Sequence, residues 1–239
     1  MAATSDASGS GPIRDPKVRQ VIARLETNRR RPGAHLTLRT LRAWAGSRMT
    51  DHSPEAFADV GYSIHPKQGD LIYLLCRAMG ARRVVDFATS VGMSALYFAT
   101  AMRDNGGGKV IGSEIVPKKI ETAHRNLVDA GLDGFVEIRA GDARETLRDL
   151  GGPVDFILVD GWPRPNTVSL AREVVEIVAP QLRVGGYVLN VTMLSPTSLS
   201  TFGLRTHRSY FFRRFPLKEF EATLPARHLR RFLVFLLIR

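Results

Sequence analysis

The sequence predicts an α/β fold, a three-layer α/β/α sandwich around a mostly parallel sheet of about seven strands. Short apolar runs recur between residues 83 and 191, and each is followed by a stretch with helical spacing of apolar residues. The runs are apolar on both faces, which is typical of parallel strands covered by helices on both sides. Two further runs near the C-terminus have no full helix between them, so we expect an antiparallel edge pair there.

The elements follow in order along the chain. A helix is expected over residues 67–79, because Leu71, Ile72, Leu74 and Leu75 recur at helical spacing. Between residues 83 and 191 a helix joins each strand to the next, and we expect these crossovers to be right-handed. Strands are expected at 83–88, 109–114, 135–140, 154–160 and 185–191, helices at 93–103, 117–130, 143–150 and 167–179, and the edge pair at 209–217 and 231–239.

The chain divides into three parts. Residues 1–12 are small, polar and without periodicity, and are expected to be a disordered tail. Residues 13–60 hold two short amphipathic stretches and are expected to form an N-terminal helical extension, serving as a lid or a dimer contact. Residues 61–239 should form the α/β domain itself.

The positive charge is unevenly distributed. Of the net charge of +11, residues 1–50 and 200–239 contribute +7 each, whereas residues 51–199 carry 15 basic and 18 acidic side chains. An enzyme that tracks phosphates would be expected to carry positive charge around its site. We therefore expect no nucleic-acid partner.

Composition also indicates a compartment. No apolar run is long enough to span a membrane, and the N-terminus has no apolar segment followed by a cleavage site. A soluble cytoplasmic protein is therefore expected. The single cysteine, Cys76, lies in an apolar helical pattern and is expected to fill the core.

Acidic residues follow four successive strands. Asp86 closes the first strand and precedes the turn Ala88–Gly92, and Glu114 closes the second, 28 positions after Asp86. Asp142 follows the third strand, and Asp160 follows the fourth together with Trp162. In an open, Rossmann-like sheet the ligand lies beyond the carboxyl ends of the strands, where a carboxylate suits the hydroxyls of a ribose. The four positions together indicate an adenosine-containing ligand.

Each position also has a structural interpretation. Asp142 is equally well explained as a helix N-cap. Glu114 has an alternative interpretation as a cap for the helix that starts at Pro117, and Trp162 has one as a wedge between helix and sheet. Caps alone do not readily explain four such positions in order on four strands.

These motifs resemble a known family. The segments HPKQGDLIYLL, VVDFATSVGMSALYFA, VIGSEIVPKKIETAHRNL, AGDARETL and VDFILVDGWP, within roughly residues 60–195, are similar to class I S-adenosylmethionine-dependent methyltransferases. The closer likeness is to the small O-methyltransferases, such as the catechol and caffeoyl-CoA O-methyltransferases. The resemblance implies S-adenosylmethionine as cofactor and a homodimer.

The resemblance also implies roles for single residues. The turn at 88–92 would pass the methionine part of the cofactor with Ser94 nearby, Glu114 would hold the ribose, and Trp162 would pack near the adenine ring. Asp142 would lie at the adenine edge, and Asp160 would face the reacting methyl group. The implied cofactor-binding residues are Asp86, Ala88, Thr89, Ser90, Gly92, Ser94, Glu114, Ile115, Gly141, Asp142, Ala143, Asp160 and Trp162.

The turn itself has one glycine where dinucleotide-binding turns have two or three. S-adenosylmethionine has no phosphate, so it needs only a tight bend, and Gly92 can supply it. Ala88 is compatible with this bend if its φ stays negative, which makes it the weakest point of the turn.

Two departures from the family bear on mechanism. Metal-dependent relatives hold Mg²⁺ with the acid after the fourth strand and an Asp-Asn pair after the fifth, where this chain has Thr192 and Met193. Asp160 alone does not supply the several oxygen ligands that a divalent ion needs, so no metal is expected. Where catechol-type enzymes keep a lysine base, this chain has Pro163 and Arg164.

The sequence therefore predicts an enzyme, an S-adenosylmethionine-dependent methyltransferase acting on a small molecule, at a hydroxyl oxygen and without metal. The general base would be Asp160 or His65, which lies in the loop before the helix at 67–79. Two alternatives stay open: an RNA methyltransferase that grips its substrate with the basic termini, and a non-catalytic protein that keeps the fold. A nicotinamide dehydrogenase would need a Gly-x-Gly-x-x-Gly turn, which is absent from the sequence.

Overall fold

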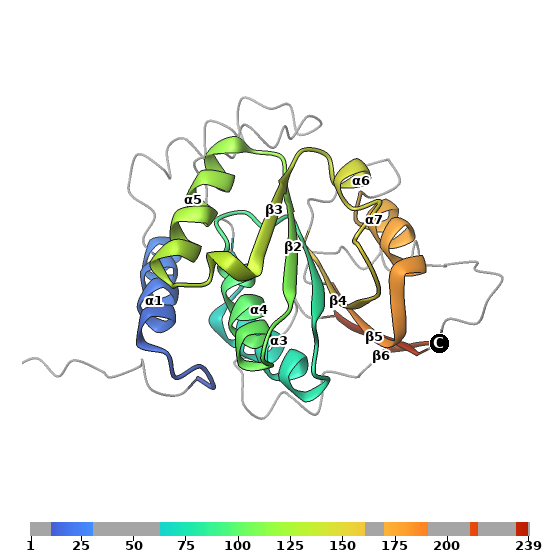
Figure 1. Ribbon diagram of the computed structural model, residues 1–239, viewed down its shortest axis with the longest axis horizontal. Coiled ribbons are helices and arrows are strands. Elements are labelled where there is room, and N and C mark those ends of the chain that lie inside the picture. Colours follow the sequence, from blue (N-terminus) through green and yellow to red (C-terminus); the bar gives the residue numbers. More distant parts are fainter. Residues whose placement is uncertain (1–10, 31–62, 161–169, 191–210, 215–232, 239) are drawn as a thin grey trace, which may run out of the picture.

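The computed structural model describes residues 11–30, 63–160, 170–190, 211–214 and 233–238. These residues include one sheet in the order β3-β2-β1-β4-β5-β7-β6 (Figure 1). β1 to β5 pair in parallel, and β7 runs antiparallel to both β5 and β6. The strands are β1 Arg83–Phe87, β2 Lys109–Glu114, β3 Val136–Ala140, β4 Val154–Val159, β5 Leu182–Asn190, β6 Phe211–Arg214 and β7 Leu233–Ile238.

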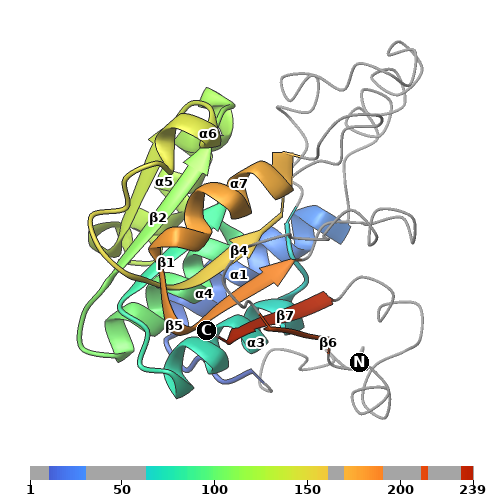
Figure 2. The ribbon, with the colours of Figure 1, turned by 90° about the vertical axis from the view of Figure 1, so that its right-hand side faces the viewer.

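The predicted Rossmann-like α/β class with a parallel sheet is confirmed. Helices cover both faces of the sheet: α1, α3, α4 and α5 lie on one side, and α6 and α7 on the other, facing the viewer in Figure 2. The segments expected at the C-terminal edge, 209–217 and 231–239, contain β6 and β7. The helices are α1 Pro16–Arg30, α3 Pro66–Ala78, α4 Met93–Asp104, α5 Pro117–Asp129, α6 Ala143–Thr146 and α7 Leu170–Val178, with short 3₁₀ turns at Asp133–Phe135 and Ala179–Gln181.

The expected helix at 143–150 is much shorter in the structure. α6 ends at Thr146, and the guanidinium of Arg139 on β3 donates to the carbonyl oxygens of Thr146 and Asp149, at 2.7 and 2.6 Å. The Arg139 side chain, which comes from a neighbouring strand, thus donates to carbonyl groups that would accept backbone N–H groups if the helix were longer.

The N-terminal helix is part of the core. Val18, Val21 and Leu25 of α1 are buried in the same cluster as the apolar residues of α3 and α4. Asp15, just before α1, pairs with Arg103 of α4 at 2.6 Å. Residues 1–10 and 31–62 lie outside the described residues, so the disordered tail, the boundary at residue 60 and a lid or dimer role stay predictions.

Cys76 is fully buried in α3, as expected for a core residue. Within the described residues, no helix has both the length and the apolar character needed to cross a membrane.

α3 packs very closely on α4 at one glycine. A Cβ at Gly69 would lie 2.1 Å from a carbon of the Tyr97 ring, and that ring is itself buried. Only a residue without a side chain allows this contact, so the small residue fixes the distance between the two helices.

Replacing Gly69 with alanine is therefore expected to lower the free energy of unfolding by about 2 kcal/mol, because the buried ring has no space to move into. Chemical denaturation measures the change. Gly134→Ala is the matched control, since a Cβ there meets no atom within 4 Å, and it should be nearly neutral. A Gly69→Ala variant as stable as the control would contradict the packing described.

Candidate functional site

The candidate site lies at the carboxyl ends of β1, β2, β3 and β4. In the strand order, β2 lies on one side of β1 and β4 on the other, so the winding reverses between β1 and β4. Ligands bind beyond such a switch point in open α/β sheets. Asp86 of β1 and Asp160, directly after β4, flank it, and the charge of Asp160 raises the pKa of Asp86.

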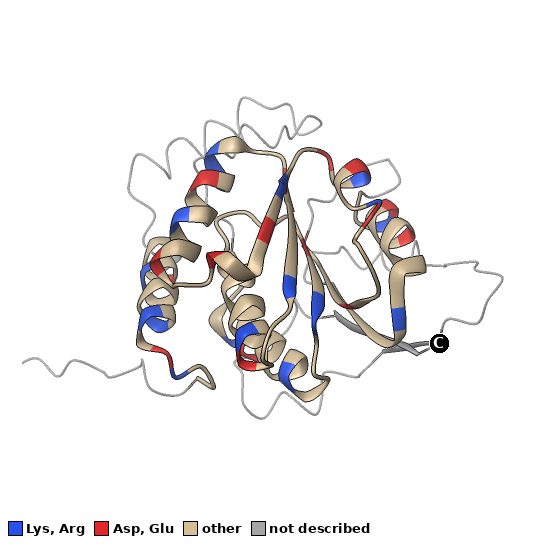
Figure 3. Ribbon diagram, in the orientation of Figure 1, with Lys and Arg blue, Asp and Glu red and all other residues tan. Residues whose placement is uncertain are grey.

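β1 and β2 each begin with a basic residue and carry a carboxylate at or near the opposite end. Arg83 begins β1 and Lys109 begins β2, whereas Arg183, near the start of β5, pairs with Asp155 of β4; Figure 3 colours the basic and acidic residues along the ribbon. The carboxylates Asp86 and Glu114 lie at or near the opposite ends. The candidate site therefore suits a cationic or hydroxyl-bearing ligand better than a phosphate.

The turn between β1 and α4 is strained. Ala88 has φ 66°, Ser90 has φ 51° and Gly92, the N-cap of α4, has φ 87°. The condition set for Ala88, a negative φ, is therefore not met. The N–H groups of Ala88 and Thr89 both donate to the carbonyl oxygen of Ser113, at 3.0 and 3.2 Å, which turns the chain sharply back over β2. A left-handed φ costs a non-glycine residue roughly 1–2 kcal/mol, so other contacts must hold this turn.

Glu114 supplies one of those contacts. Its carboxylate accepts the N–H of Ser90 at 2.8 Å, and the N–H groups of Ile115 and Val116 at 2.9 and 3.0 Å. Glu114 thus caps the turn that leads into α5, whose own N-cap is Val116, and it also links this turn to the strained one. A carboxylate offers about four acceptor positions, and these three N–H groups leave one of them, on Oε2, for a hydroxyl of a ligand.

Glycine is required in β2 just below this turn. A Cβ at Gly112 would lie 2.5 Å from the hydroxyl oxygen of Thr89, which donates to the carbonyl of Asp86. The turn therefore rests directly on the backbone of the neighbouring strand.

Asp86 is the most unusual residue of the site. It is fully buried; one carboxyl oxygen, Oδ2, accepts the Ser94 hydroxyl at 2.9 Å, and the other, Oδ1, has no hydrogen-bond partner among the described residues. Burial, together with the charges of Asp160 and Glu114, raises the pKa of Asp86 to about 7, against the hydrogen bond from Ser94. The hydroxyl of Ser90 is also buried without a partner. Unsatisfied buried polar atoms are rare in folded proteins and point to a missing ligand.

The raised pKa makes stability depend on pH. Between the unfolded pKa near 3.8 and the folded pKa of about 7, the folded protein binds more protons than the unfolded one, so stability falls as pH rises. The free energy of unfolding should drop by about 2 kcal/mol between pH 5 and pH 8, and Asp86→Asn should flatten this drop. Urea titrations of both proteins across this range measure it; an unchanged slope in Asp86→Asn would show that Asp86 ionises normally.

Asp160 lies across the switch point from Asp86. It is half-buried, and removal of its carboxyl from solvent raises its pKa to about 6. Near neutral pH a carboxyl with this pKa is ionised and still basic enough to accept a proton, which suits a general base. Trp162 lies outside the described residues, as do Pro163, Arg164, Thr192 and Met193.

The end of β3 closes the site beside Glu114. Gly141 donates to the backbone carbonyl of Glu114 at 3.0 Å, and Ala143 is buried. Asp142 is the N-cap of α6: its carboxylate accepts the N–H of Arg144 at 2.8 Å and is held by the Arg144 guanidinium. Ile115 extends from the end of β2 with 44% of its surface exposed, which leaves an apolar side chain available to a flat ring.

His65 has a clear structural role. It is the N-cap of α3: its Nδ1 accepts the N–H of Lys67 at 3.2 Å, and its own N–H donates to the Gln68 side chain at 2.6 Å. This reciprocal pair is a capping box with histidine in the place of serine or threonine. A neutral imidazole whose Nδ1 accepts carries its proton on Nε2, which leaves no lone pair for a base.

Two residues near the site escaped the sequence analysis. Asn126 and Lys119 lie on the buried face of α5, and Asn126 donates from Nδ2 to the carbonyl of Val91 at 2.8 Å. Burial lowers the pKa of Lys119, while the nearby charge of Glu114 opposes this. The sequence did carry a signal for them. Lys119, Ala123 and Asn126 are spaced i, i+4 and i+7, which places two polar residues on the helix face that packs against the core.

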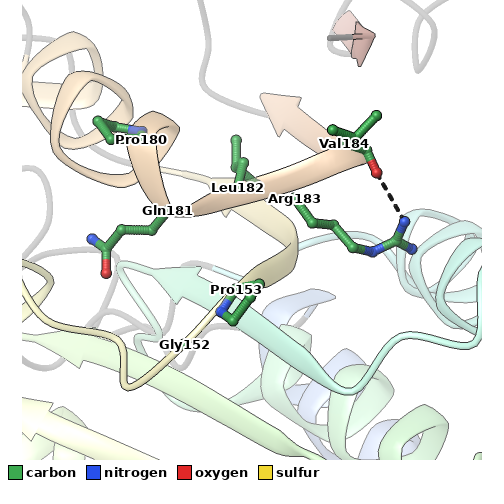
Figure 4. Close-up of a pocket in the computed structure, with 7 residues that line it drawn as sticks. All are labelled: Gly152, Pro153, Pro180, Gln181, Leu182, Arg183 and Val184. Atoms are coloured by element: carbon green, nitrogen blue, oxygen red, sulfur yellow. Dashed lines mark hydrogen bonds between the residues drawn. The ribbon is translucent and has the colours of Figure 1, made fainter.

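No group of three or more histidine, cysteine or acidic side chains is placed to hold a metal ion in the described part of the chain. A separate depression of about 460 Å³ lies at the amino ends of β4 and β5, lined by Pro153, Pro180, Leu182 and Arg183 among others (Figure 4). It is at the opposite end of the strands from the carboxylates, so it is not part of the candidate site.

Comparison with known proteins places this arrangement in context. Residues 87–190 match the sequence model of a family described as a methyltransferase domain. A catechol O-methyltransferase of Niastella koreensis is 32% identical over 144 residues, which cover 56% of this chain and 64% of that protein. A catechol O-methyltransferase of Mycobacterium tuberculosis is 34% identical over 134 residues, covering 53% and 60%. The chain thus spans less than two thirds of the length of these curated relatives.

Solved structures share the fold. The O-methyltransferase TomG from Streptomyces achromogenes, in complex with SAM, superposes with a TM-score of 0.56 at 19% identity, covering 84% of this chain and 96% of that one. An O-methyltransferase from Bacillus cereus, in complex with SAH, gives a TM-score of 0.56 at 18% identity, covering 95% and 93%.

Proposed function

We propose that this chain, a member of the class I small O-methyltransferase family, transfers a methyl group from S-adenosylmethionine to a hydroxyl oxygen of a small molecule. The observation that carries the proposal is the pair of carboxyls, Asp86 and Asp160, on either side of the switch point. Both have raised pKa values, and one oxygen of Asp86 is buried without a partner. Two such groups favour a positively charged ligand, which stabilises their ionised forms.

S-adenosylmethionine fits this donor set. Its ammonium and sulfonium groups are cations, its ribose carries two hydroxyls, and it has no phosphate. We assign the cationic end to Asp86 and the turn Ala88–Gly92, and the ribose hydroxyls to Glu114. Support comes from the unpartnered atoms Asp86 Oδ1 and Ser90 Oγ, which need a donor or acceptor that the described residues do not supply.

The remaining contacts follow from position along the strand ends. Ser94 orients Asp86 through its hydroxyl, and Thr89 holds the turn on the backbone of β1. Ile115 offers its exposed apolar side chain to the adenine, with Gly141, Asp142 and Ala143 at the ring's edge and Trp162 as a further stacking surface.

Proton transfer is assigned to Asp160. The bound cofactor supplies a methyl group on a sulfonium, ready for in-line displacement. Asp160 orients the acceptor hydroxyl and accepts its proton, and its pKa of about 6 suits this role near neutral pH. His65 is the weaker choice, because its Nδ1 is used in capping α3. We propose no metal in this step, since a carboxylate and a positioned cofactor suffice for a hydroxyl whose proton is accepted locally.

A titration tests the proposal first. Calorimetry should detect one S-adenosylmethionine per chain, and S-adenosylhomocysteine should form when catechols or other phenols are added, with chelator present as well as with Mg²⁺. No binding would refute the enzyme, and binding without turnover on any hydroxyl acceptor would favour a non-catalytic relative. A cytoplasmic location and a homodimer, with residues up to 60 as lid or contact, stay predictions; light scattering measures the dimer.

A further inference from the structure

The strained β1–α4 turn is restrained at both of its ends. At the start, Ala88 and Thr89 are tied to β2 through Ser113, and Ser90 is tied to Glu114. At the far end, the carbonyl of Val91 accepts a hydrogen bond from Asn126 Nδ2 at 2.8 Å. A turn with two left-handed non-glycine residues persists only where its surroundings over-determine it. Asn126 is therefore one of the groups that define the turn's shape.

α5 also contacts the turn directly. Ala123, one turn before Asn126, is buried, and a Cβ at Gly92 would lie 3.2 Å from the Ala123 Cβ. Residues three apart on a helix share a face, so Ala123 presses on the turn where Asn126 holds it. Asn126 is itself 5% exposed, which makes its hydrogen bonds hard to replace by water.

The other end of the Asn126 amide is held by the N-terminal helix. Nη2 of Arg24 in α1 donates to Asn126 Oδ1 at 2.9 Å and to Asp129 Oδ2 at 2.6 Å. α1 and α5 pack side by side in Figure 1. Because the guanidinium is only a donor, it fixes the amide oxygen toward α1 and the amide nitrogen toward Val91.

We infer that Arg24 and Asn126 are positioning residues for the cofactor turn, so that the N-terminal helix sets the shape of the turn and with it the affinity for the cofactor. The inference rests on the proposed function for the identity of the ligand. The relay runs from Arg24 through the Asn126 amide to the Val91 carbonyl, one residue before the N-cap of α4. Neither side chain needs to touch the ligand.

Two variants and a matched control test the relay. In Asn126→Asp, the partner of Arg24 is kept, but a carboxylate oxygen faces the Val91 carbonyl in place of the amide donor. The Kd for S-adenosylhomocysteine is expected to rise about tenfold. Arg24→Met frees the amide to flip and should raise the Kd about threefold. Asp129→Asn removes the exposed ion pair with Arg24 but leaves the relay, and should bind like the wild type.

Amide hydrogen exchange separates this inference from the proposed function. In the ligand-free protein, Asn126→Asp and Arg24→Met should speed exchange of the Gly92 N–H, which donates to the Thr89 carbonyl at 2.9 Å, whereas Asp129→Asn should not. If the wild type binds no S-adenosylhomocysteine but the two variants still exchange faster than the wild type, the relay is upheld and the cofactor is refuted. Unchanged exchange and unchanged Kd in both variants, with only a lower melting temperature, would overturn the relay.

Discussion

Asp160→Asn is expected to lower kcat about 100-fold or more, because the amide keeps the shape of the side chain but cannot accept a proton. The Kd for S-adenosylhomocysteine, which lacks the sulfonium charge, should change much less, since Asp86 and Glu114 stay in place. Single-turnover methylation of a phenolic acceptor, with cofactor binding measured separately by calorimetry, gives both numbers. The contrast between a large loss in kcat and a small change in Kd is what marks a group acting in the chemical step.

The pH dependence gives an independent readout of the same group. The pKa of Asp160 in the ligand-free protein is about 6, and only the ionised carboxylate accepts a proton, so kcat/KM should rise with pH through that region and then level off. The residual activity of Asp160→Asn should not show this rise with pH.

His65→Asn is the matched control for Asp160→Asn. An asparagine oxygen replaces Nδ1 as the acceptor for the N–H of Lys67, so the cap of α3 is kept while the imidazole is removed. We expect its kcat to stay near the wild-type value. If His65→Asn loses activity and Asp160→Asn does not, the base is His65, and the assignment made here is wrong.

Glu114→Ala is expected to weaken cofactor binding by at least about tenfold, which is about 1.4 kcal/mol. The carboxylate is assigned to the ribose hydroxyls, and it also accepts the N–H groups of Ser90, Ile115 and Val116. Its removal therefore takes away a ligand contact and loosens the strained turn at the same time. Isothermal titration with S-adenosylhomocysteine measures the loss without needing an acceptor.

Glu145→Ala is a suitable control for Glu114→Ala. Glu145 lies in α6 at the same end of the sheet, but it is exposed and pairs with Arg148, so its removal should leave the Kd unchanged. If Glu114→Ala binds S-adenosylhomocysteine normally but melts at a lower temperature, Glu114 has only a structural role, as the cap of the turn before α5.

Local pattern was enough to predict the frame of the site. The apolar runs and helical spacings placed β1 to β5 close to their observed positions, and the acids that close them, Asp86 and Glu114, lie at or near the strand ends as expected. The alternative interpretation of Asp142 as an N-cap also holds, since its carboxylate accepts the Arg144 N–H. The HPKQ segment carried a capping signal at His65 and Gln68, which a search restricted to serine and threonine caps overlooks.

The sequence by itself determined the order of strands and helices and the acids at the strand ends, because those depend on the nature of each residue and on the spacing of its near neighbours. Only the tertiary structure decided the left-handed φ of Ala88, the buried and unpartnered oxygen of Asp86, and the link from Arg24 through Asn126 to Val91. Each of these depends on atoms far apart in the chain. A backbone dihedral follows the hydrogen bonds that a neighbouring strand offers, and a carboxyl's pKa follows the solvent and charges that packing leaves around it.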